Sequence, residues 1–113
     1  MFCDVFCKII NGDIPCSKVY EDDLVLAFND IDPQAPVHFL VIPKKHIKSV
    51  DEIDSTNSAI IAPIFEVISK LAKELNLANG YRVVTNCGED GGQSVGHLHF
   101  HILGGRALTL EMA

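Results

Sequence analysis

The feature that most restricts the fold is a strict alternation of histidine and apolar side chains over residues 97–103, HLHFHIL. Successive side chains of a β-strand point to opposite faces of the sheet, so this pattern predicts a strand with one apolar and one histidine face. Neighbouring imidazoles compete for hydrogen-bond partners and repel each other once protonated, so a purely structural role does not explain the triplet. We therefore interpret three residues as one functional site facing a cleft: His97, His99 and His101.

A second pattern, with a period near that of a helix, covers residues 54–79. Apolar residues recur there at intervals of three and four, which predicts one amphipathic helix that packs over the apolar face of strand 97–103. Pro63 lies inside the pattern, so either the main helix begins there or an earlier turn is kinked. The apolar stripe consists of Ile60, Ile61, Ile64, Ile68, Leu71 and Leu75.

Shorter elements complete the expected fold. The segment VFCKIINGDIP predicts a short helix that ends at Asn11-Gly12. Because one long helix separates the strands instead of alternating with each of them, we expect an α+β fold with a five-stranded, mainly antiparallel sheet. We find no linker or repeat and expect one domain over residues 1–113. The expected strands are 19–20, 24–28, 37–43, 81–86 and 97–103.

Composition excludes several classes of protein. A net charge of -6 argues against a general nucleic-acid binder, because affinity for the phosphate backbone comes mainly from Lys and Arg. No apolar run approaches the roughly 20 residues that cross a bilayer, and the N-terminus lacks the basic region of a secretion signal. We therefore expect a cytoplasmic protein with no membrane partner. In that reducing compartment its four cysteines would be thiols or metal ligands.

The glycine-rich segment GGQS, residues 91–94, precedes the histidines and favours phosphate binding over metal binding. Alternate strand positions lie about 6.5 Å apart, so three of them converge poorly on one ion. Glycines let backbone N–H groups approach an anion, and Ser94 adds a hydroxyl donor. A phosphate beside several imidazoles indicates nucleophilic catalysis by a histidine, with the surrounding donors holding the phosphate oxygens.

These residues resemble a known family. GHLHFHIL is similar to the histidine triad motif, and the segments FCKIINGDIP, VYEDDLVLAFNDIDPQAPVHFLVIPKKHI, GYRVVTN and GGQSVGHLHFHILGGR extend the likeness over nearly the whole chain. It is most similar to the Hint branch of the histidine triad (HIT) superfamily. The resemblance implies a HIT-like fold and an enzyme that needs no cofactor for its chemistry. Such an enzyme binds a purine mononucleotide (AMP or GMP) and hydrolyses its phosphoramidates through a covalent nucleotidyl-histidine. The alternatives are a nucleotide-binding regulatory module with weak turnover and a dinucleoside polyphosphate hydrolase.

The resemblance assigns catalytic roles to individual residues. His99 would be the nucleophile, and His101 would hydrogen-bond the phosphate. His97 would help to orient the strand and the tautomer of the nucleophile. Ser94 would assist the leaving group, and His38 would support the triad from the buried strand.

The resemblance also implies a nucleotide-binding site. Asp30 would accept the ribose hydroxyls, Asn86 would lie against the phosphate or ribose, and four apolar side chains would enclose the purine. The full implied set is Phe6, Ile9, Phe28, Asp30, Ile31, Asn86, Gly92, Gln93, Ser94, His99 and His101.

A structural zinc is a further alternative that the resemblance raises, since some bacterial relatives bind zinc through a CxxC motif and two histidines. Here Cys7, His46 and His97, completed by Cys3 or Asp4, would give four ligands of the kind that zinc accepts. The other interpretation is that Cys7 is a buried thiol and His46 a surface residue.

The chain departs from the family pattern at two places. Gly96 stands where many members carry a bulky aromatic residue, and this difference would either loosen the entry to the histidine strand or open the site. The C-terminal ALTLEMA lacks the tryptophan that some relatives place near a partner subunit's site. The preference for a leaving group is therefore left open.

Two features predict a homodimer, which the resemblance also implies. Strand 81–86 is apolar enough to be a liability at the edge of a sheet. The long helix carries further apolar residues outside its main stripe, namely Phe65, Val67 and Ala72. The resemblance implies that this strand and helix pair across a two-fold axis to give one continuous sheet.

Overall fold

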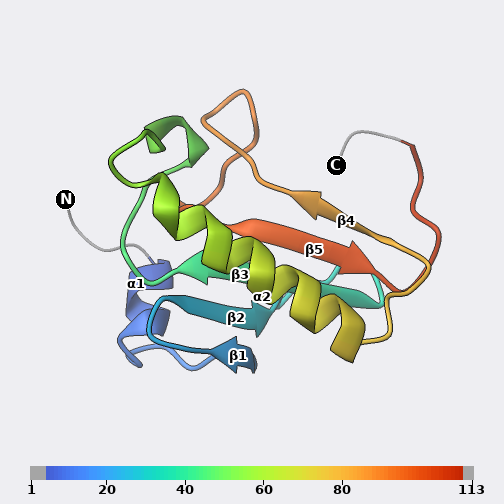
Figure 1. Cartoon of the computed structure of the whole chain (residues 1–113). Helices are drawn as coiled ribbons and strands as arrows, with labels where there is room; N and C mark the ends of the chain where they lie inside the picture. The colour runs from blue at the N-terminus through green and yellow to red at the C-terminus, as the bar shows by residue number, and fades with distance from the viewer. Residues whose placement is uncertain (1–4, 111–113) are drawn as a thin grey trace.

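A computed structural model of the chain describes residues 5–110. In this part of the chain the five strands form one antiparallel sheet in the order β1-β2-β3-β5-β4 (Figure 1). The predicted α+β class, five-stranded sheet, long helix and short N-terminal helix are confirmed. The elements are α1 (Val5–Ile10), β1 (Lys18–Glu21), β2 (Val25–Asn29), β3 (Val37–Pro43), α2 (Ile61–Glu74), β4 (Tyr81–Val84) and β5 (Phe100–Gly104).

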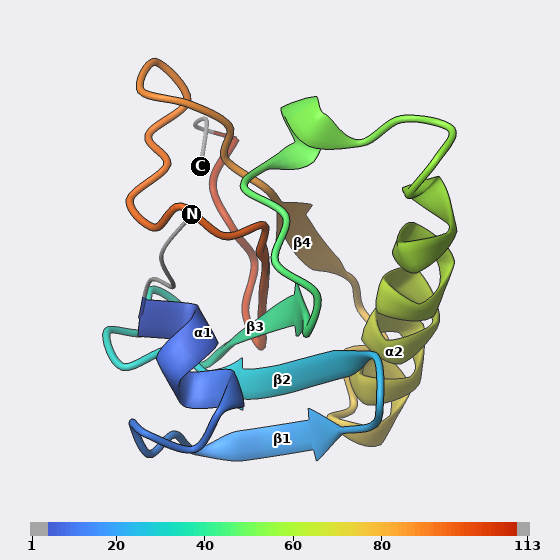
Figure 2. The same ribbon diagram turned by 90° about the vertical axis from the view of Figure 1, so that its left-hand side faces the viewer.

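Helix α2 covers one face of the sheet (Figure 2). Its buried residues recur at helical spacing, and they meet inward side chains that recur at every second position of the strands. Removal of this apolar surface from water is the main stabilising contribution to the fold. The prediction that the apolar face of the histidine segment packs under the helix is confirmed, because Leu98, Phe100 and Ile102 all belong to this core.

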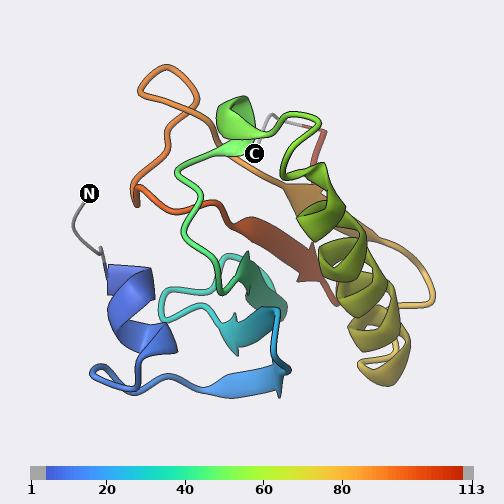
Figure 3. The same ribbon diagram turned by 60° about the vertical axis from the view of Figure 1, so that its left-hand side comes forward.

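Helix α1 covers only part of the opposite face (Figure 3). Phe6 projects from it into a second core with residues of β2 and β3, and its ring meets that of Phe28 edge-on at a centroid separation of 5.6 Å. The β5–β4 side of this face is not covered by either helix of the described chain. His38 of β3 and His101 of β5 project from this same face, opposite α2.

Helix α2 is shorter than the repeat over residues 54–79 predicted. It begins at Ile61, after two short 3₁₀ turns at Val50–Glu52 and Ser58–Ile60, and it ends at Glu74. Pro63 therefore stands in the first turn of the helix, where the N–H that proline lacks would have no intrahelical partner anyway. The first of the two alternatives for Pro63 is correct.

Two strands are also shorter than expected. Strand β5 begins at Phe100 instead of His97, because the Leu98 N–H turns away to donate to the Ile47 carbonyl at 2.6 Å. Strand β4 ends at Val84 instead of residue 86, and the next residue, Thr85, bonds the His99 carbonyl through its side-chain hydroxyl at 2.8 Å. The first two histidines therefore precede the regular strand.

Candidate active site

His99 is held in one tautomer. It is 3% exposed, and its Nδ1 lies 2.7 Å from the backbone carbonyl oxygen of His97. A carbonyl oxygen only accepts, so Nδ1 carries the proton and Nε2 keeps its lone pair. The ring of Phe6 stands edge-on to the imidazole at a centroid distance of 5.0 Å and restricts its rotation. This is the protonation state that a nucleophilic imidazole needs.

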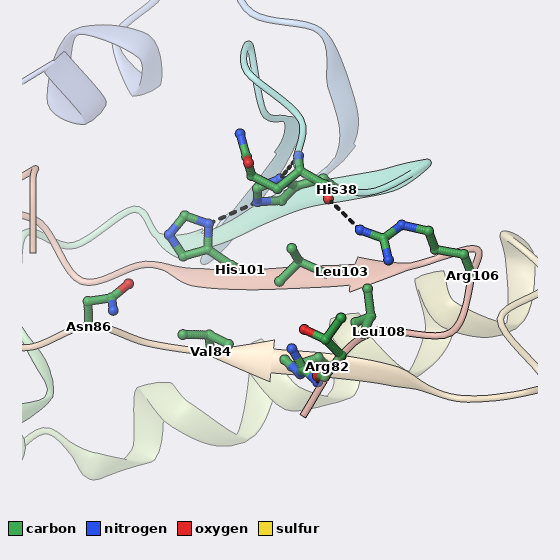
Figure 4. Close-up of a pocket in the computed structure, with 10 residues that line it drawn as sticks. His38, Arg82, Val84, Asn86, His101, Leu103, Arg106 and Leu108 are labelled. Atoms are coloured by element: carbon green, nitrogen blue, oxygen red, sulfur yellow. Dashed lines mark hydrogen bonds between the residues drawn. The ribbon is translucent and has the colours of Figure 1, made fainter. Parts of the chain in front are cut away.

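A single backbone amide fixes the tautomers of His38 and His101. The N–H of Gln34 donates to His38 Nδ1 at 3.0 Å, so neutral His38 carries its proton on Nε2. That nitrogen lies 3.0 Å from Nδ1 of His101, which must then accept (Figure 4). Neutral His101 consequently carries its own proton on Nε2. It can donate a hydrogen bond to a phosphate oxygen without being charged.

His101 stays neutral well below physiological pH. Burial lowers the pKa of His101 to about 4, and the neighbouring imidazoles of His99 and His38 act in the same direction. Asp30 opposes this effect, with its Oδ2 lying 3.9 Å from His101 Nδ1 and 3.4 Å from His38 Nε2. The carboxylate is held in place by the N–H of Asp32, which donates to Oδ1 at 2.8 Å.

A cavity of about 300 Å³ brings most of the expected nucleotide-binding residues together. Its walls are mainly apolar, with a carboxylate, two imidazoles and a hydroxyl at their margin, which suits a flat ring with a polar tail. Ile31 lies only at the rim, because its side chain is fully exposed. Expected residues that line the cavity are Phe6, Ile9, Phe28, Asp30, Ile31, Ser94, His99 and His101, and Val5, Asn29, Leu40 and Val95 line it as well.

The side chain of Gln93 folds the glycine-rich loop. Its Nε2 donates to the Lys48 carbonyl at 2.7 Å and to the Val95 carbonyl at 2.9 Å, and its Oε1 accepts from the Gly88 N–H at 2.9 Å. These bonds place Ser94 at the cavity wall. The side chain thus shapes this glycine-rich loop from within.

Glycine is required at two positions of the same loop. A Cβ on Gly91 would lie 2.3 Å from the carbonyl oxygen of Cys87, and Gly92 has a φ of +77°. The side-chain amide of Asn86 donates to the Gly91 carbonyl at 2.8 Å and so fixes the start of the loop. Asn86 lies outside the apolar cavity, in a neighbouring one that it shares with His38 and His101.

His97 does not share the cleft with the other two histidines, contrary to our interpretation of the alternation. It is fully buried, and its Nε2–H donates to the Pro43 carbonyl at 2.8 Å. Its Nδ1 lone pair faces Cys7 Sγ at 3.8 Å, and Nδ1 of His46 lies 3.3 Å from the same sulfur. The reason is the turn of the chain ahead of β5, which rotates His97 away from the sheet face.

The donor atoms of Cys7, His46 and His97 all lie within 4.8 Å of one another. His46 Nε2 is buried and has no hydrogen-bond partner in the described part of the chain. His46 is therefore not simply a surface residue, since its ring faces the sulfur. Cys3 and Asp4, the expected fourth ligands, lie outside the described residues.

The chain is similar to known proteins over nearly its whole length. The family model described as "HIT domain" matches residues 11–108. A solved histidine triad protein from Clostridium difficile is 54% identical with a TM-score of 0.92, covering 96% of this chain and 95% of its own. A HIT family hydrolase from Clostridium thermocellum is 46% identical with a TM-score of 0.94, covering 100% and 99%. A histidine triad nucleotide-binding protein from Candida albicans is 34% identical with a TM-score of 0.81, covering 98% and 86%. Among the described helices, none is long and apolar enough to span a bilayer.

Proposed function

The chain belongs to the HIT domain family, and from this premise we propose that it is a hydrolase that cleaves the phosphorus–nitrogen bond between a purine nucleotide and an amine. The observation that carries the proposal is the tautomer of His99. Its Nδ1–H is fixed by the His97 carbonyl at 2.7 Å, and its Nε2 lone pair belongs to a ring that lines the apolar cavity. Hydrolase and nucleotide-binding activities among the similar proteins support the same class.

The residues divide the reaction into two steps. His99 Nε2 attacks phosphorus and forms a P–N bond, while the bond to the leaving amine breaks. The electron pair stays on the amine nitrogen, which takes a proton from solvent through the Ser94 hydroxyl. Water then attacks phosphorus, releases His99 and forms the free mononucleotide. Throughout, the neutral His101 donates Nε2–H to a phosphate oxygen, and Ser94 provides a hydroxyl at the leaving-group side.

The base and ribose have separate recognition elements. The purine would lie between Phe6, Ile9 and Phe28, whose side chains line the apolar part of the cavity. Asp30 lies at the same cavity with one oxygen, Oδ2, directed toward the histidines. A ribose hydroxyl can donate to this carboxylate, which places the 5′-phosphate toward His99 and His101.

The experiment is a turnover assay on AMP and GMP phosphoramidates beside diadenosine polyphosphates. We expect both phosphoramidates to be cleaved with kcat/KM at least about 100-fold above the polyphosphates, since an amine leaves readily once protonated. Rapid quenching and mass spectrometry should find the nucleotidyl group on His99. Efficient cleavage of diadenosine polyphosphates alone would favour the dinucleotide hydrolase, and tight AMP binding without any turnover would favour the regulatory module.

A structural zinc fits the buried cluster of Cys7, His46 and His97. The lone pair on His97 Nδ1 is oriented by the Pro43 carbonyl bonded to the other nitrogen, which is the second-sphere arrangement usual for a histidine ligand. The thiol and both imidazoles are donors that zinc prefers. The metal would fix α1 against the segment after β3, and the chemistry at His99 does not involve it.

A homodimer built on the β4 edge completes the proposal. Tyr81 and Val83 are exposed on this strand, and Phe65 is exposed on α2. The opposite edge is protected, because β1 carries Lys18 and Glu21 and has an irregular register. Val67 and Ala72 do not contribute, contrary to expectation, because both are buried in the core beneath α2.

A further inference from the structure

A second cavity of about 380 Å³ adjoins the catalytic one, and His101 lines both. It lies on the sheet face opposite α2, over β5 and β4. Figure 4 shows Asn86 and His101 at one end and Arg82 and Arg106 at the other, with Leu103 between them. With the base in the catalytic cavity, the expected nucleotide would reach this space only with its phosphate, at the Asn86 and His101 end.

Two cationic side chains line this cavity of an acidic chain. The sequence has two arginines, Arg82 and Arg106, and both line this cavity. Arg82 donates to the Thr109 carbonyl, and Arg106 donates to the Ala107 carbonyl at 3.0 Å and the Gln34 carbonyl at 3.2 Å. These acceptors are uncharged. Over residues 5–110, no carboxylate forms an ion pair with either guanidinium.

The sheet register fixes the distance between the arginines and the reacting phosphate. Val84 pairs with His101, and Arg82 pairs with Leu103, so Arg82 stands two residues further along the sheet than the phosphate donor. Two residues of a strand span about 6.6 Å. The floor between the two ends is apolar, since Val84 and Leu103 form it. A short aliphatic chain would cross this floor and bring its far end to the guanidinium groups.

We propose that this cavity is the leaving-group subsite and that it selects amines whose short aliphatic chain ends in an anionic group, a carboxylate or a phosphate. The inference rests on the proposed function. Guanidinium presents a planar fork of N–H donors that matches both anions, and each arginine retains donors beyond those used by the carbonyls. As the P–N bond breaks, the amine nitrogen keeps the electron pair and takes a proton from solvent through the Ser94 hydroxyl, which lines the catalytic cavity. The chain of the amine lies in the second cavity, and the product leaves through the arginine end.

The test compares AMP conjugates that differ only in the far end of the amine. The conjugate of 4-aminobutanoate carries a carboxylate, that of 4-aminobutanamide is its neutral match, and that of 3-aminopropylphosphonate carries a phosphonate. We expect kcat/KM for the carboxylate conjugate to exceed that for the amide by about tenfold, because charge-assisted hydrogen bonds are stronger than neutral ones. Comparison with the phosphonate then identifies the preferred anion. Raising the ionic strength should reduce the preference.

Substitutions of the two arginines test whether this cavity causes the preference for an amine with an anionic end. Arg82→Gln should lower kcat/KM for the carboxylate conjugate to about the level of the amide conjugate and should affect the amide conjugate much less, because the amide loses only a neutral acceptor's hydrogen bond. Arg106→Gln should have a smaller effect of the same kind, since Arg106 is exposed and Arg82 is half-buried. Lys73→Gln removes the same charge from α2, on the other face of the sheet, and should not alter the ratio. If Arg82→Gln fails to fold, the proposal is still tested by three results. These are the wild-type ratio of kcat/KM for the two conjugates, the dependence of that ratio on salt, and the effect of Arg106→Gln.

The outcomes separate this inference from the proposed function. A wild-type ratio near one, or an equal loss for both conjugates in Arg82→Gln, would overturn the anionic subsite. Unsubstituted AMP phosphoramidate has no amine chain, so its cleavage tests only the proposed function. Cleavage of that compound together with a ratio near one rejects the subsite alone. Failure to cleave it rejects the function on which the subsite rests.

Discussion

His38 Nε2 donates a hydrogen bond to His101 Nδ1 across 3.0 Å, and the direction of this bond is set by the Gln34 N–H on the other side of the His38 ring. Two buried or half-buried imidazoles can otherwise exchange roles, because either nitrogen of a neutral ring can carry the proton. One backbone amide removes this freedom. The result is a neutral His101 whose outer nitrogen is a donor, as a phosphate anion requires.

Substitution of His38 should therefore impair catalysis through His101. We expect His38→Phe, which keeps a ring of similar size, to lower kcat about 10- to 100-fold with little change in the KM for nucleotide. In ¹⁵N NMR spectra His101 should lose its single Nε2–H tautomer. His38→Gln, which can restore an N–H donor, should recover part of the activity. An unchanged His101 tautomer in His38→Phe would show that the bond does not orient it.

Removal of the nucleophile should separate turnover from binding. His99→Ala should reduce turnover about 10³-fold or more, while AMP binding by calorimetry persists because Asp30 and the purine cavity are untouched. His101→Ala should be milder, because it removes only a donor to the phosphate. Near-normal activity in His99→Ala, combined with inactivity of His97→Ala or His101→Ala, would show that His99 is not the nucleophile.

Stability should fall between pH 6.5 and pH 4 because of His101. The folded state holds the pKa of His101 at about 4 instead of 6.5, so in this range the unfolded chain binds a proton that the folded chain does not. The contribution is therefore present above pH 6.5 and is lost as the pH falls toward 4. With 23% of the side chain exposed to water, we expect a loss of about 1–2 kcal/mol. Urea unfolding of the wild type and of His101→Gln across this range measures the loss. If the free energies of unfolding of the two proteins had parallel pH dependences, the loss would not come from His101.

Zinc should be present in protein purified without chelator, at about one ion per chain by elemental analysis. Cys7→Ser should abolish it, because the thiol lies within reach of both imidazoles. Cys16→Ser is the matched control, since Cys16 packs against the core next to α1 and is not part of the cluster. Absence of zinc from the wild-type protein would leave Cys7 as a buried thiol that hydrogen-bonds to imidazole.

Light scattering at micromolar concentration should give twice the monomer mass. Val83→Lys should shift the protein toward monomer, because it places a charge on the apolar β4 edge. Leu24→Lys makes the same kind of change at an exposed position in the β1–β2 turn and should leave the mass unchanged. A monomer mass for the wild-type protein at this concentration would reject the proposed assembly.

The sequence by itself determined the architecture, and it named most of the residues that meet in the candidate site. The two periodicities, near 3.6 residues over the helix and two over the strands, identify which side chains face the core, and burial of those side chains selects one arrangement. Pro63 and Gly92 suit their backbone positions because of their own covalent structure. Proline lacks an N–H and stands in the first turn of α2, and glycine lacks a Cβ and adopts a positive φ. The triad motif with Ser94 ahead of it is equally local, and so residues near it in sequence could be assigned to the site.

Only the tertiary structure decided which residues distant in sequence hydrogen-bond to one another, and where charged side chains lie together. The alternation predicted three histidines on one face, but the hydrogen bond from the Leu98 N–H to the Ile47 carbonyl turns His97 toward Cys7 and His46. The amide of Gln34 sets the tautomer of a histidine on β5 through His38, and no local pattern signals this. Arg82 and Arg106 are unremarkable in sequence and meet at one cavity because of strand register and the turn after β5. Hydrogen-bond direction and charge proximity depend on a few ångströms between separate elements, and sequence spacing does not encode such distances.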